Sequence, residues 1–207
     1  MNAAQILANG VRQLELDLSQ EALEKLLTYL ELLQKWNRVY NLTAIRQPEQ
    51  MVSHHLLDSL AVLPHLYKGR WLDVGCGAGL PGLVLAMARP QWQFTLLDSN
   101  SKKTGFVQQA AIDLKLDNVA VYCARVENWQ DAGKFDGIIS RAFAGLADFI
   151  AATRHLLAEG GCWAAMKGEP SSEEMQKLPA GVEIVRTIPL VVPNMEAARC
   201  LIMLKAN

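Results

Sequence analysis

The feature of this sequence that most constrains its fold is a short apolar run that passes directly into a glycine-rich turn. Residues 71–74 form the run, which contains Asp73, and glycines follow it at alternate positions: Gly75, Gly77 and Gly79. Pro81 then occupies a position typical of the first turn of a helix. The pattern predicts a buried strand, a tight turn and a helix, which together begin an α/β sheet.

The spacing of the glycines argues against a dinucleotide site. A dinucleotide fingerprint would place its third glycine at position 80, where this chain has Leu80. A backbone without β-carbons can still approach a ligand closely. The turn therefore suits a ligand that has no pyrophosphate for the helix to hold, and S-adenosylmethionine, with its ribose and methionine portions, is such a ligand.

A second acidic residue ends the next apolar run. Asp98 follows residues 93–97, about twenty residues beyond the glycines, where an α/β unit returns its second strand beside the first. A carboxylate there can accept hydrogen bonds from both ribose hydroxyls, each contributing about 1.5–3 kcal/mol. The alternative is that Asp98 only caps the following helix. The two acidic strand ends together favour S-adenosylmethionine as the cofactor.

The chain divides near Gly69 into a helical N-terminal extension, residues 1–69, and a domain in which strands and helices alternate, residues 70–207. In the extension, Ser19 is the predicted N-cap of a long helix whose leucines recur at helical spacing as far as Tyr40. The other helices expected in the extension cover residues 2–16 and 48–64.

The larger domain contains seven apolar segments that indicate strands, at 70–74, 93–97, 118–123, 135–140, 161–166, 182–190 and 198–205. Helices are expected at 81–88, 101–114, 145–157 and 171–177. Helical segments separate the first five strands, which predicts right-handed crossovers and a mainly parallel sheet. The last two strands are too close in sequence for a crossover and should pair antiparallel. This is the arrangement of class I methyltransferases.

Composition and charge exclude several classes of protein. Hydrophobic residues make up 51% of the chain, which predicts a packed globule, yet no stretch approaches the roughly twenty apolar residues of a membrane span. The four cysteines are scattered without metal-ligand spacing and fit a reduced cytosol. A net charge of −1 means that any RNA site must be a local patch. We expect a cytoplasmic monomer that binds neither membrane nor metal.

Further candidate residues follow the later strands, because ligands of open α/β sheets bind beyond the carboxyl ends of the strands. Residues 123–127 follow the third strand and are expected near the adenine of the cofactor. Arg141 and Phe143 follow the fourth strand, and Lys167 ends the fifth. For Arg141 the alternative is an ordinary surface ion pair, worth under about 1 kcal/mol. For Phe143 the alternative is packing in the core.

In the helical extension, the adjacent histidines His54 and His55 point about 100° apart on a helix and cannot easily share one metal ion. We expect Asp58 and Ser59 to fix the extension against the sheet, with His55 hydrogen-bonded to the chain. The extension then forms a cap over the cofactor site.

These segments together resemble the glucose-inhibited division protein B family, the bacterial 16S rRNA guanine-N7 methyltransferases. The most specific segments are Trp-Asn-x-x-Tyr-Asn-Leu-Thr at 36–43 and Ser-Arg-Ala-Phe at 140–143. Others lie at 55–60, 72–82, 96–99, 125–127 and 167–168. The resemblance implies the class I S-adenosylmethionine-dependent methyltransferase fold. In that fold a Rossmann-like, seven-stranded, mostly parallel sheet has an antiparallel last strand and carries an N-terminal helical cap.

The resemblance also implies contacts between S-adenosylmethionine and Gly75, Leu80, Val126, Glu127 and Arg141. With the residues argued above, the expected cofactor site comprises Asp73, Gly75, Gly77, Gly79, Leu80, Asp98, Val126, Glu127 and Arg141. The implied substrate is N7 of guanine 527 in 16S rRNA, as free RNA or within a small-subunit assembly particle.

The chemistry of that substrate agrees with what the sequence lacks. Neither the Asn-Pro-Pro-Phe type of motif used for exocyclic amines nor a cysteine pair for carbon-5 attack on pyrimidines is present. Guanine N7 carries an exposed lone pair and loses no proton on methylation, so in-line proximity can provide most of the catalysis. We therefore name no general base and expect Arg141 and Phe143 to position the target base.

The RNA contacts expected from the sequence are Lys102, Lys103, Arg125 and Lys167, which follow strands at one edge of the sheet. Three other functions remain open from the residues alone. They are methylation of a small molecule or another RNA, a non-catalytic nucleotide-binding or division-associated role, and a dehydrogenase, which the glycine spacing disfavours.

Overall fold

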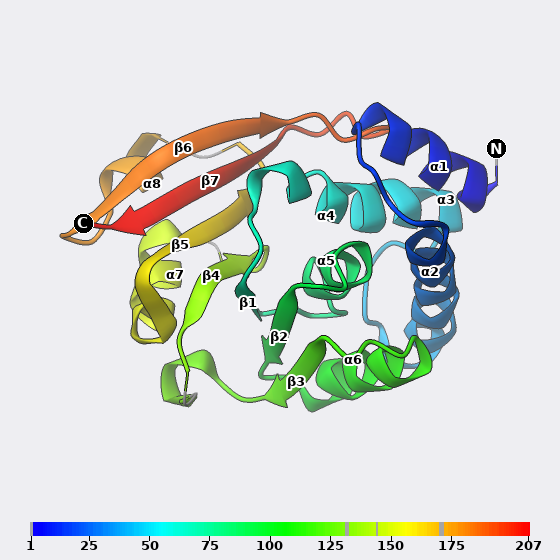
Figure 1. Ribbon diagram of the computed structural model, residues 1–207, viewed down its shortest axis with the longest axis horizontal. Coiled ribbons are helices and arrows are strands. Elements are labelled where there is room, and N and C mark those ends of the chain that lie inside the picture. The colour runs from blue at the N-terminus through cyan, green and yellow to red at the C-terminus, as the bar shows by residue number, and fades with distance from the viewer. Residues whose placement is uncertain (1, 131–132, 144, 170–171) are drawn as a thin grey trace.

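A seven-stranded sheet in the order β3-β2-β1-β4-β5-β7-β6 forms the centre of the computed structural model, with helices on both of its faces (Figure 1). The structure describes residues 2–130, 133–143, 145–169 and 172–207. The strands are β1 Arg70–Val74, β2 Gln93–Asp98, β3 Val119–Cys123, β4 Phe135–Ser140, β5 Leu157–Lys167, β6 Val182–Leu190 and β7 Arg199–Ala206.

The directions of the strands confirm the predicted topology. β1 pairs in parallel with β2 and β4, and the outer strands β3 and β5 continue the parallel arrangement. β7 lies between β5 and β6 and is antiparallel to both. In β1, Trp71 packs into one hydrophobic core and Leu72 into the other, and both are fully buried. Strands buried on both faces appear in sequence as continuous apolar runs, which is why they could be recognised.

Two hydrophobic cores lie on opposite faces of the sheet. On one face pack α1 Ala3–Gln13, α2 Gln20–Tyr40, α5 Gly82–Ala88 and α6 Ser101–Asp113. On the other face pack α7 Leu146–Thr153 and the 3₁₀ turn that follows it. The short helix α8 Ser172–Gln176 lies near α7 (Figure 1).

The N-terminal helices share a core with the sheet. Leu7 and Leu33 belong to the same buried cluster as Phe106 of α6. The hydroxyl of Tyr29 on α2 donates a 2.8 Å hydrogen bond to the carbonyl of Ala78 in the glycine turn. The core therefore continues across Gly69, and the division into two domains there stays a prediction.

The segment expected as one helix over 48–64 is broken into several types of helix. It contains α3 Pro48–Met51, a π-helix Val52–Leu57, α4 Asp58–Leu60 and a 3₁₀ turn Leu63–His65. α1 packs against the π-helix, where a β-carbon on Gly10 would overlap the side chain of Leu57. Apolar periodicity does not reveal the extra residue of a π turn, so the sequence predicted only that a helix exists.

Three other expectations were wrong in detail. The helix predicted for 145–157 ends at Thr153, and β5 begins at Leu157 rather than at 161. The pairing of β4 with β5 shifts register at Phe135/Gly137, and the glycines at 160 and 161 lie in this irregular part of β5. Adjacent glycines are typical of a turn, which is why the sequence predicts a strand that begins only at 161. The connection from β3 to β4 contains, among the described residues, only the 3₁₀ turn Val126–Asn128 and no full helix.

Candidate active site

The glycine turn lies at the carboxyl end of β1 and brings bare backbone to the edge of the sheet. The amides of Gly75 and Cys76 donate to the carbonyl of Leu97 on β2, at 2.8 and 3.1 Å, which ties the turn to the neighbouring strand. Gly75 and Gly77 have φ values of +70° and +56°, which L side chains rarely adopt. A β-carbon on Gly77 would project into open space, so the turn leaves room for a ligand beside its backbone.

Asp73 supports the turn from behind and does not reach the pockets described below. Its side chain is fully buried, and its Oδ2 accepts a 2.7 Å hydrogen bond from the amide of Gly82 at the start of α5. Burial raises the pKa of Asp73 to about 7. Gly79 likewise faces the start of α5, where a β-carbon would overlap Leu83. A direct cofactor contact by either residue stays a prediction.

Asp98 ends β2 beside the glycine turn, as the sequence predicted. Its Oδ2 accepts a 2.9 Å hydrogen bond from the amide of Gly77, and its Oδ1 accepts a 2.8 Å bond from the amide of Asn100. The N-cap of α6 is Asn100, whose side chain accepts from the amides of Lys102 and Lys103. The alternative reading of Asp98 as the cap of α6 is therefore wrong, and its carboxylate is left facing the pocket.

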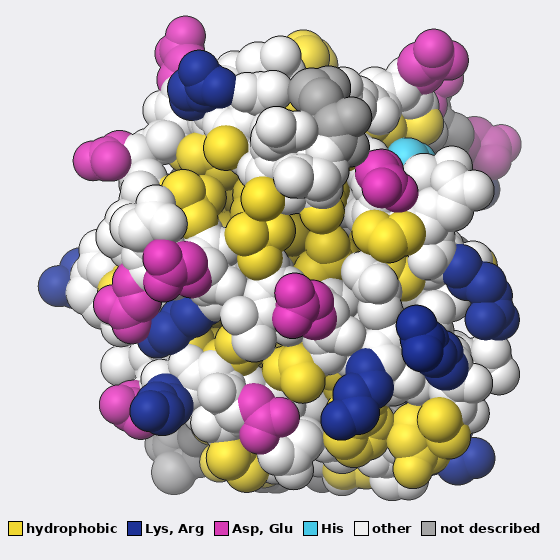
Figure 2. Space-filling model, turned by 90° about the vertical axis from the view of Figure 1, so that its right-hand side faces the viewer, with side chains coloured by type: hydrophobic (Ala, Val, Ile, Leu, Met, Phe, Trp, Pro, Cys, Tyr) yellow, Lys and Arg dark blue, Asp and Glu magenta, His cyan; other side chains and the backbone are white. Residues whose placement is uncertain are grey.

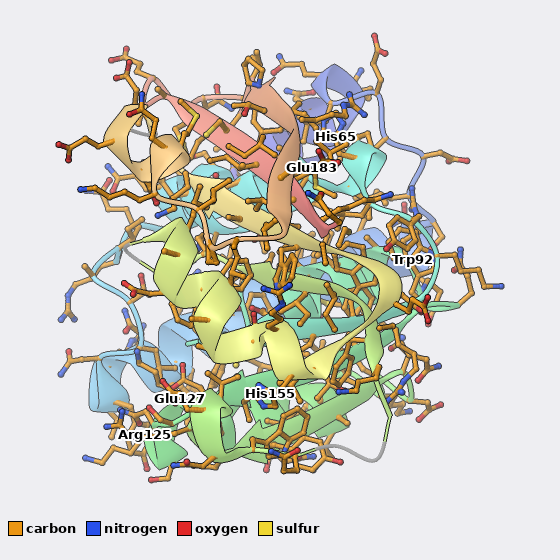
Figure 3. The ribbon with its side chains drawn as sticks, turned by 90° about the vertical axis from the view of Figure 1, so that its left-hand side faces the viewer. His65, Trp92, Arg125, Glu127, His155 and Glu183 are labelled. Carbon is orange, nitrogen blue, oxygen red and sulfur yellow. The ribbon has the colours of Figure 1, made fainter. Side chains whose placement is uncertain are left out.

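The first pocket of the site has a volume of about 200 Å³ and lies beyond the ends of β1, β2, β3 and β4. Its lining brings together predicted cofactor residues and their neighbours: Gly75, Asp98, Ser99, Ala124, Arg125, Val126, Glu127, Ala142 and Phe143. Figure 3 shows Arg125 and Glu127 near each other, after β3. The carboxylate of Asp98 and the bare backbone of the glycine turn lie side by side, and together they fit the ribose and the methionine part of a nucleoside cofactor.

A second pocket, of about 210 Å³, continues from the first along the glycine turn. It shares Gly75 and Ala142 with the first pocket, and its other lining residues are Leu42, Thr43, His55, Cys76, Gly77, Ala78, Leu80 and Arg141. A third pocket, of about 380 Å³, shares His55 and Arg141 with the second and is also lined by Ile45, His54, Asp58, Met166, Lys167, Gly168 and Arg199. The three pockets therefore adjoin one another in series around the end of β4.

The helical cap contributes one wall of the second pocket, and the segment at 36–43 forms part of that wall. Asn37 is buried, and its side-chain oxygen accepts a 2.9 Å hydrogen bond from the amide of Thr43. The hydroxyl of Thr43 in turn lies 2.9 Å from Nε2 of His55 on the π-helix. Burial and the nearby charge of Arg141 lower the pKa of His55 to about 4, so the imidazole is neutral at pH 7.

Asp58 joins the cap to two strands. Its carboxylate pairs with Nη1 of Arg141, which follows β4, at 3.0 Å, and with Nε of Arg199, which begins β7, at 3.2 Å. The Asp58 side chain is 2% exposed, whereas each arginine side chain is 29% exposed. The expectation that Asp58 fixes the extension against the sheet is confirmed. Among the described residues, the buried Oγ of Ser59 finds no hydrogen-bond partner, so Ser59 does not share that role.

The loop after β4 carries Phe143 and is held by an ion pair. Phe143 contacts Phe149, with ring centroids 5.2 Å apart, and lines the first pocket rather than the third. Nζ of Lys167 lies 2.7 Å from Glu174 of α8 and donates to the carbonyl of Phe143 at 3.0 Å. The same Glu174 accepts a hydrogen bond from the amide of Leu146. The ammonium of Lys167 is therefore engaged within the protein.

The other predicted RNA contacts are more accessible. Lys102 and Arg125 are exposed, and Lys103 is partly exposed, at the start of α6 and after β3. On the face formed by the N-terminal helices, acidic and basic side chains are interspersed (Figure 2). That face carries no uniformly basic field, which agrees with a net charge of −1.

Two site residues were not found from the sequence. Arg199 and Glu174 lie outside the strand ends that the sheet rule nominates, because β7 runs in the opposite direction to the other strands and α8 is peripheral. Among the residues that the structure describes, no group of three or more His, Cys, Asp or Glu side chains is placed to hold a metal ion. The same part of the chain has no helix that is long and apolar enough to cross a membrane.

The fold is shared with solved methyltransferase structures. A SAM-dependent methyltransferase from Thiobacillus denitrificans in complex with S-adenosyl-L-homocysteine superimposes with a TM-score of 0.53 at 15% identity, over 86% of this chain and 97% of that chain. The ribosomal protein L11 methylase from Lactobacillus delbrueckii subsp. bulgaricus gives a TM-score of 0.57 at 16% identity, over 73% and 77% of the two chains. At these identities the likeness shows the fold alone, and it confirms the class I prediction.

Sequence relatives are much closer. The ribosomal RNA small subunit methyltransferase G of Methylobacillus flagellatus is 51% identical over 98% of both chains. That of Laribacter hongkongensis is 52% identical over 99% of both chains. The family model described as rRNA small subunit methyltransferase G matches residues 22–203. This chain therefore belongs to the rRNA small subunit methyltransferase G family.

Proposed function

We propose that this protein transfers the methyl group of S-adenosylmethionine to N7 of guanine 527 in 16S rRNA. Membership of the family makes the chain an S-adenosylmethionine-dependent methyltransferase of ribosomal RNA. The base and the atom are the proposal. The observation that supports it best is the series of three adjoining pockets around the end of β4, which offers a place for a nucleoside cofactor and, next to it, a place for a second group.

The residues present fit the cofactor. The open space beside Gly77 leaves the backbone accessible, and Asp98 can accept bonds from ribose hydroxyls with the same carboxylate that orders the turn. Val126 and Glu127 line the far end of the first pocket, where we place the adenine. Thr43 and His55 close the second pocket from the side of the cap. These contacts bind and orient the cofactor and keep bulk water from it.

The proposed reaction requires no proton transfer. When bound, S-adenosylmethionine supplies a methyl group on a positively charged sulfur, and the lone pair of guanine N7 can accept it while the electrons of the broken bond return to sulfur. The chain must then align the base and tolerate its new positive charge. His55 is held neutral, and Asp58 lies at the next pocket with its charge available to offset the arginines. Neither residue needs to act as a base.

Mass mapping of small-subunit rRNA tests the proposal. RNA from cells that lack this protein should gain one methyl group, at N7 of guanine 527, when it is treated with the purified protein and S-adenosylmethionine. The matched control is the Asp98→Ala variant, which should give much less product. Methylation of another nucleotide or atom, or transfer into a metabolite extract but not into RNA, would contradict the proposal.

Three finer statements belong to the same proposal. We propose that the protein acts as a monomer, in the cytoplasm where ribosomes are assembled, and on an assembly particle in preference to free RNA. The absence of a strong basic field in the charge balance supports the last point, because free RNA is held mainly through its phosphates. Comparing the initial rates on free 16S rRNA and on small-subunit particles at equal salt tests it, and a higher rate on free RNA contradicts it.

A further inference from the structure

The third pocket, between the π-helix and the ends of β5 and β7, has the size of a binding site for a small organic group. Its volume of about 380 Å³ equals that of about a dozen water molecules. It adjoins the pocket beside the glycine turn, and the two pockets share the lining residues His55 and Arg141. A group bound here would therefore lie next to the methyl donor.

Two guanidinium groups offer unused donors to this pocket. Arg199 uses Nε for Asp58 and Nη1 for the carbonyl of Ala198, at 3.2 and 3.0 Å. Arg141 uses Nη1 for Asp58 and for the carbonyl of His54. Within the described residues, Nη2 of neither arginine has a hydrogen-bond partner, and Asp58 fixes both side chains in place. These are preorganised donors for an acceptor that enters the pocket.

A buried ring nitrogen is a second, independent sign of a ligand. His55 is 5% exposed, and its Nε2 is satisfied by Thr43. Its Nδ1 is buried and has no partner among the described residues. Because an unsatisfied buried polar atom is costly, its presence in the wall between two pockets is explained by a partner that arrives with a ligand.

The other walls favour a flat, uncharged group over a phosphate. Ile45 and Met166 present apolar side chains that suit the faces of an aromatic base. Most of the positive charge is compensated, since Asp58 pairs with both arginines and offsets one of their two charges, while Glu174 offsets the charge of Lys167. A phosphate site would instead keep its cations uncompensated.

We propose that this pocket receives the target guanine of the RNA and that Nη2 of Arg199 donates a hydrogen bond to its O6. The proposal rests on the function proposed above. An arginine donor matches the O6 acceptor of guanine and opposes the amino group that adenine carries at the same position. A contact to O6 alone leaves the lone pair of N7 available for the methyl group. Arg199 thus selects the base, while Arg141 links the base pocket to the cofactor pockets.

The test measures RNA binding without methyl transfer. Small-subunit rRNA is ligated from transcripts and a synthetic segment that carries guanosine, inosine or 2-aminopurine at the nucleotide the enzyme methylates, which is mapped beforehand. Inosine keeps O6, and 2-aminopurine lacks it. Filter binding in saturating S-adenosylhomocysteine should show that the wild-type protein binds the guanosine and inosine RNAs equally and the 2-aminopurine RNA about tenfold more weakly.

The variants separate recognition from charge and folding. Arg199→Met should bind all three RNAs equally. Arg199→Lys keeps a positive charge beside Asp58 but has no second terminal nitrogen to reach O6, so it should also lose the discrimination. If Arg199 had a purely structural role, lysine would restore wild-type binding. Arg186→Met, which removes an exposed arginine of β6 that lines none of the three pockets, is the control and should behave as wild type.

Discrimination against 2-aminopurine that persists in both Arg199 variants would overturn the proposal, and so would equal binding of all three RNAs by the wild-type protein. Failure of the proposed function gives a different result. In that case discrimination appears in the binding assay, but the methyl group maps to another atom.

Discussion

Nη1 of Arg141 lies 3.0 Å from Oδ2 of Asp58, although 83 positions separate the two residues in the chain. The same carboxylate meets Arg199, 141 positions further along than Asp58. A single buried acid therefore holds the cap, the end of β4 and the start of β7 together. The series of pockets depends on this junction because its members line the third pocket and Arg141 also lines the second.

Asp58→Asn should lower the free energy of unfolding by about 2–3 kcal/mol. Loss of one partner of a buried ion pair costs about 3–5 kcal/mol, and the 29% exposure of both arginine side chains reduces that figure. Urea unfolding measures the change. Glu21→Gln breaks an exposed pair with Lys25 on α2 and is the control, with an expected change of under about 1 kcal/mol. Equal midpoints for wild type and Asp58→Asn would contradict the role of the junction.

Asp98→Ala should weaken the binding of S-adenosylmethionine about ten- to a hundredfold, because the variant loses charge-assisted bonds to the ribose and loosens the turn at Gly77. Isothermal titration calorimetry measures the affinity. Asp113→Ala removes an exposed acid at the end of α6 and should leave the affinity unchanged. Unchanged affinity in Asp98→Ala removes this residue from the site.

Reversing the charge of Lys102 and Lys103 together should raise the KM for RNA and leave cofactor affinity unchanged. Both residues lie in the first turn of α6, near the end of β2, on the edge of the sheet that carries the pockets. Lys205→Glu is the control, since β7 runs antiparallel and places Lys205 beside Cys162, at the opposite end of the sheet. Equal KM values for the double variant and wild type at matched salt would exclude this patch.

Lys167→Met should leave the salt dependence of RNA binding unchanged. Its side chain is 12% exposed, and its ammonium is engaged by Glu174 and the carbonyl of Phe143, so no phosphate contact is lost. Arg125→Met, by contrast, should reduce the log–log slope by about 0.7 if it neutralises one phosphate. Filter binding over a salt series measures both slopes. A reduced slope for Lys167→Met would contradict this prediction and support the RNA contact that the sequence analysis expects for Lys167.

Asp73→Asn should become more stable relative to wild type as the pH rises from 4 to 7. Burial raises the pKa of Asp73 in the folded protein to about 7, from an ordinary value of 3.8. A group with a raised folded pKa stabilises the fold fully below its unfolded pKa, and this contribution is lost as the pH rises through the folded pKa. Asparagine does not titrate, so the variant does not lose stability in this way as the pH rises. Chemical unfolding at several pH values tests this, and a constant difference between the two proteins would contradict it.

The parts of the site that follow parallel strands could be predicted from the sequence, for a physical reason. Asp98 ends β2, Val126 follows β3 and Arg141 follows β4, and the carboxyl ends of these parallel strands meet at one edge of the sheet. The hairpin of β6 and β7 was also predictable, because its connection is too short for a crossover.

The parts that depend on long-range contacts could not be predicted in this way. Arg199 begins an antiparallel strand, so no strand-end rule nominates it, and only the folded chain brings it to Asp58. Lys167 does end a parallel strand, but the sequence could not show that Glu174 of a separate helix engages its charge. Phe143 likewise lies at the expected edge of the sheet, but it lines the first pocket, where we place the cofactor, and not the third.

Because β7 lies between β5 and β6, β6 cannot join the sheet during translation until β7 has been made. Within the described part of the chain β6 pairs only with β7, so it leaves the ribosome with no strand to join until Arg199–Ala206 has been synthesised. Arg199 arrives with that same strand. The nascent chain therefore cannot complete the junction at Asp58, or the pocket beside it, before β7 has emerged, and we expect a product truncated before β7 to be inactive for that reason.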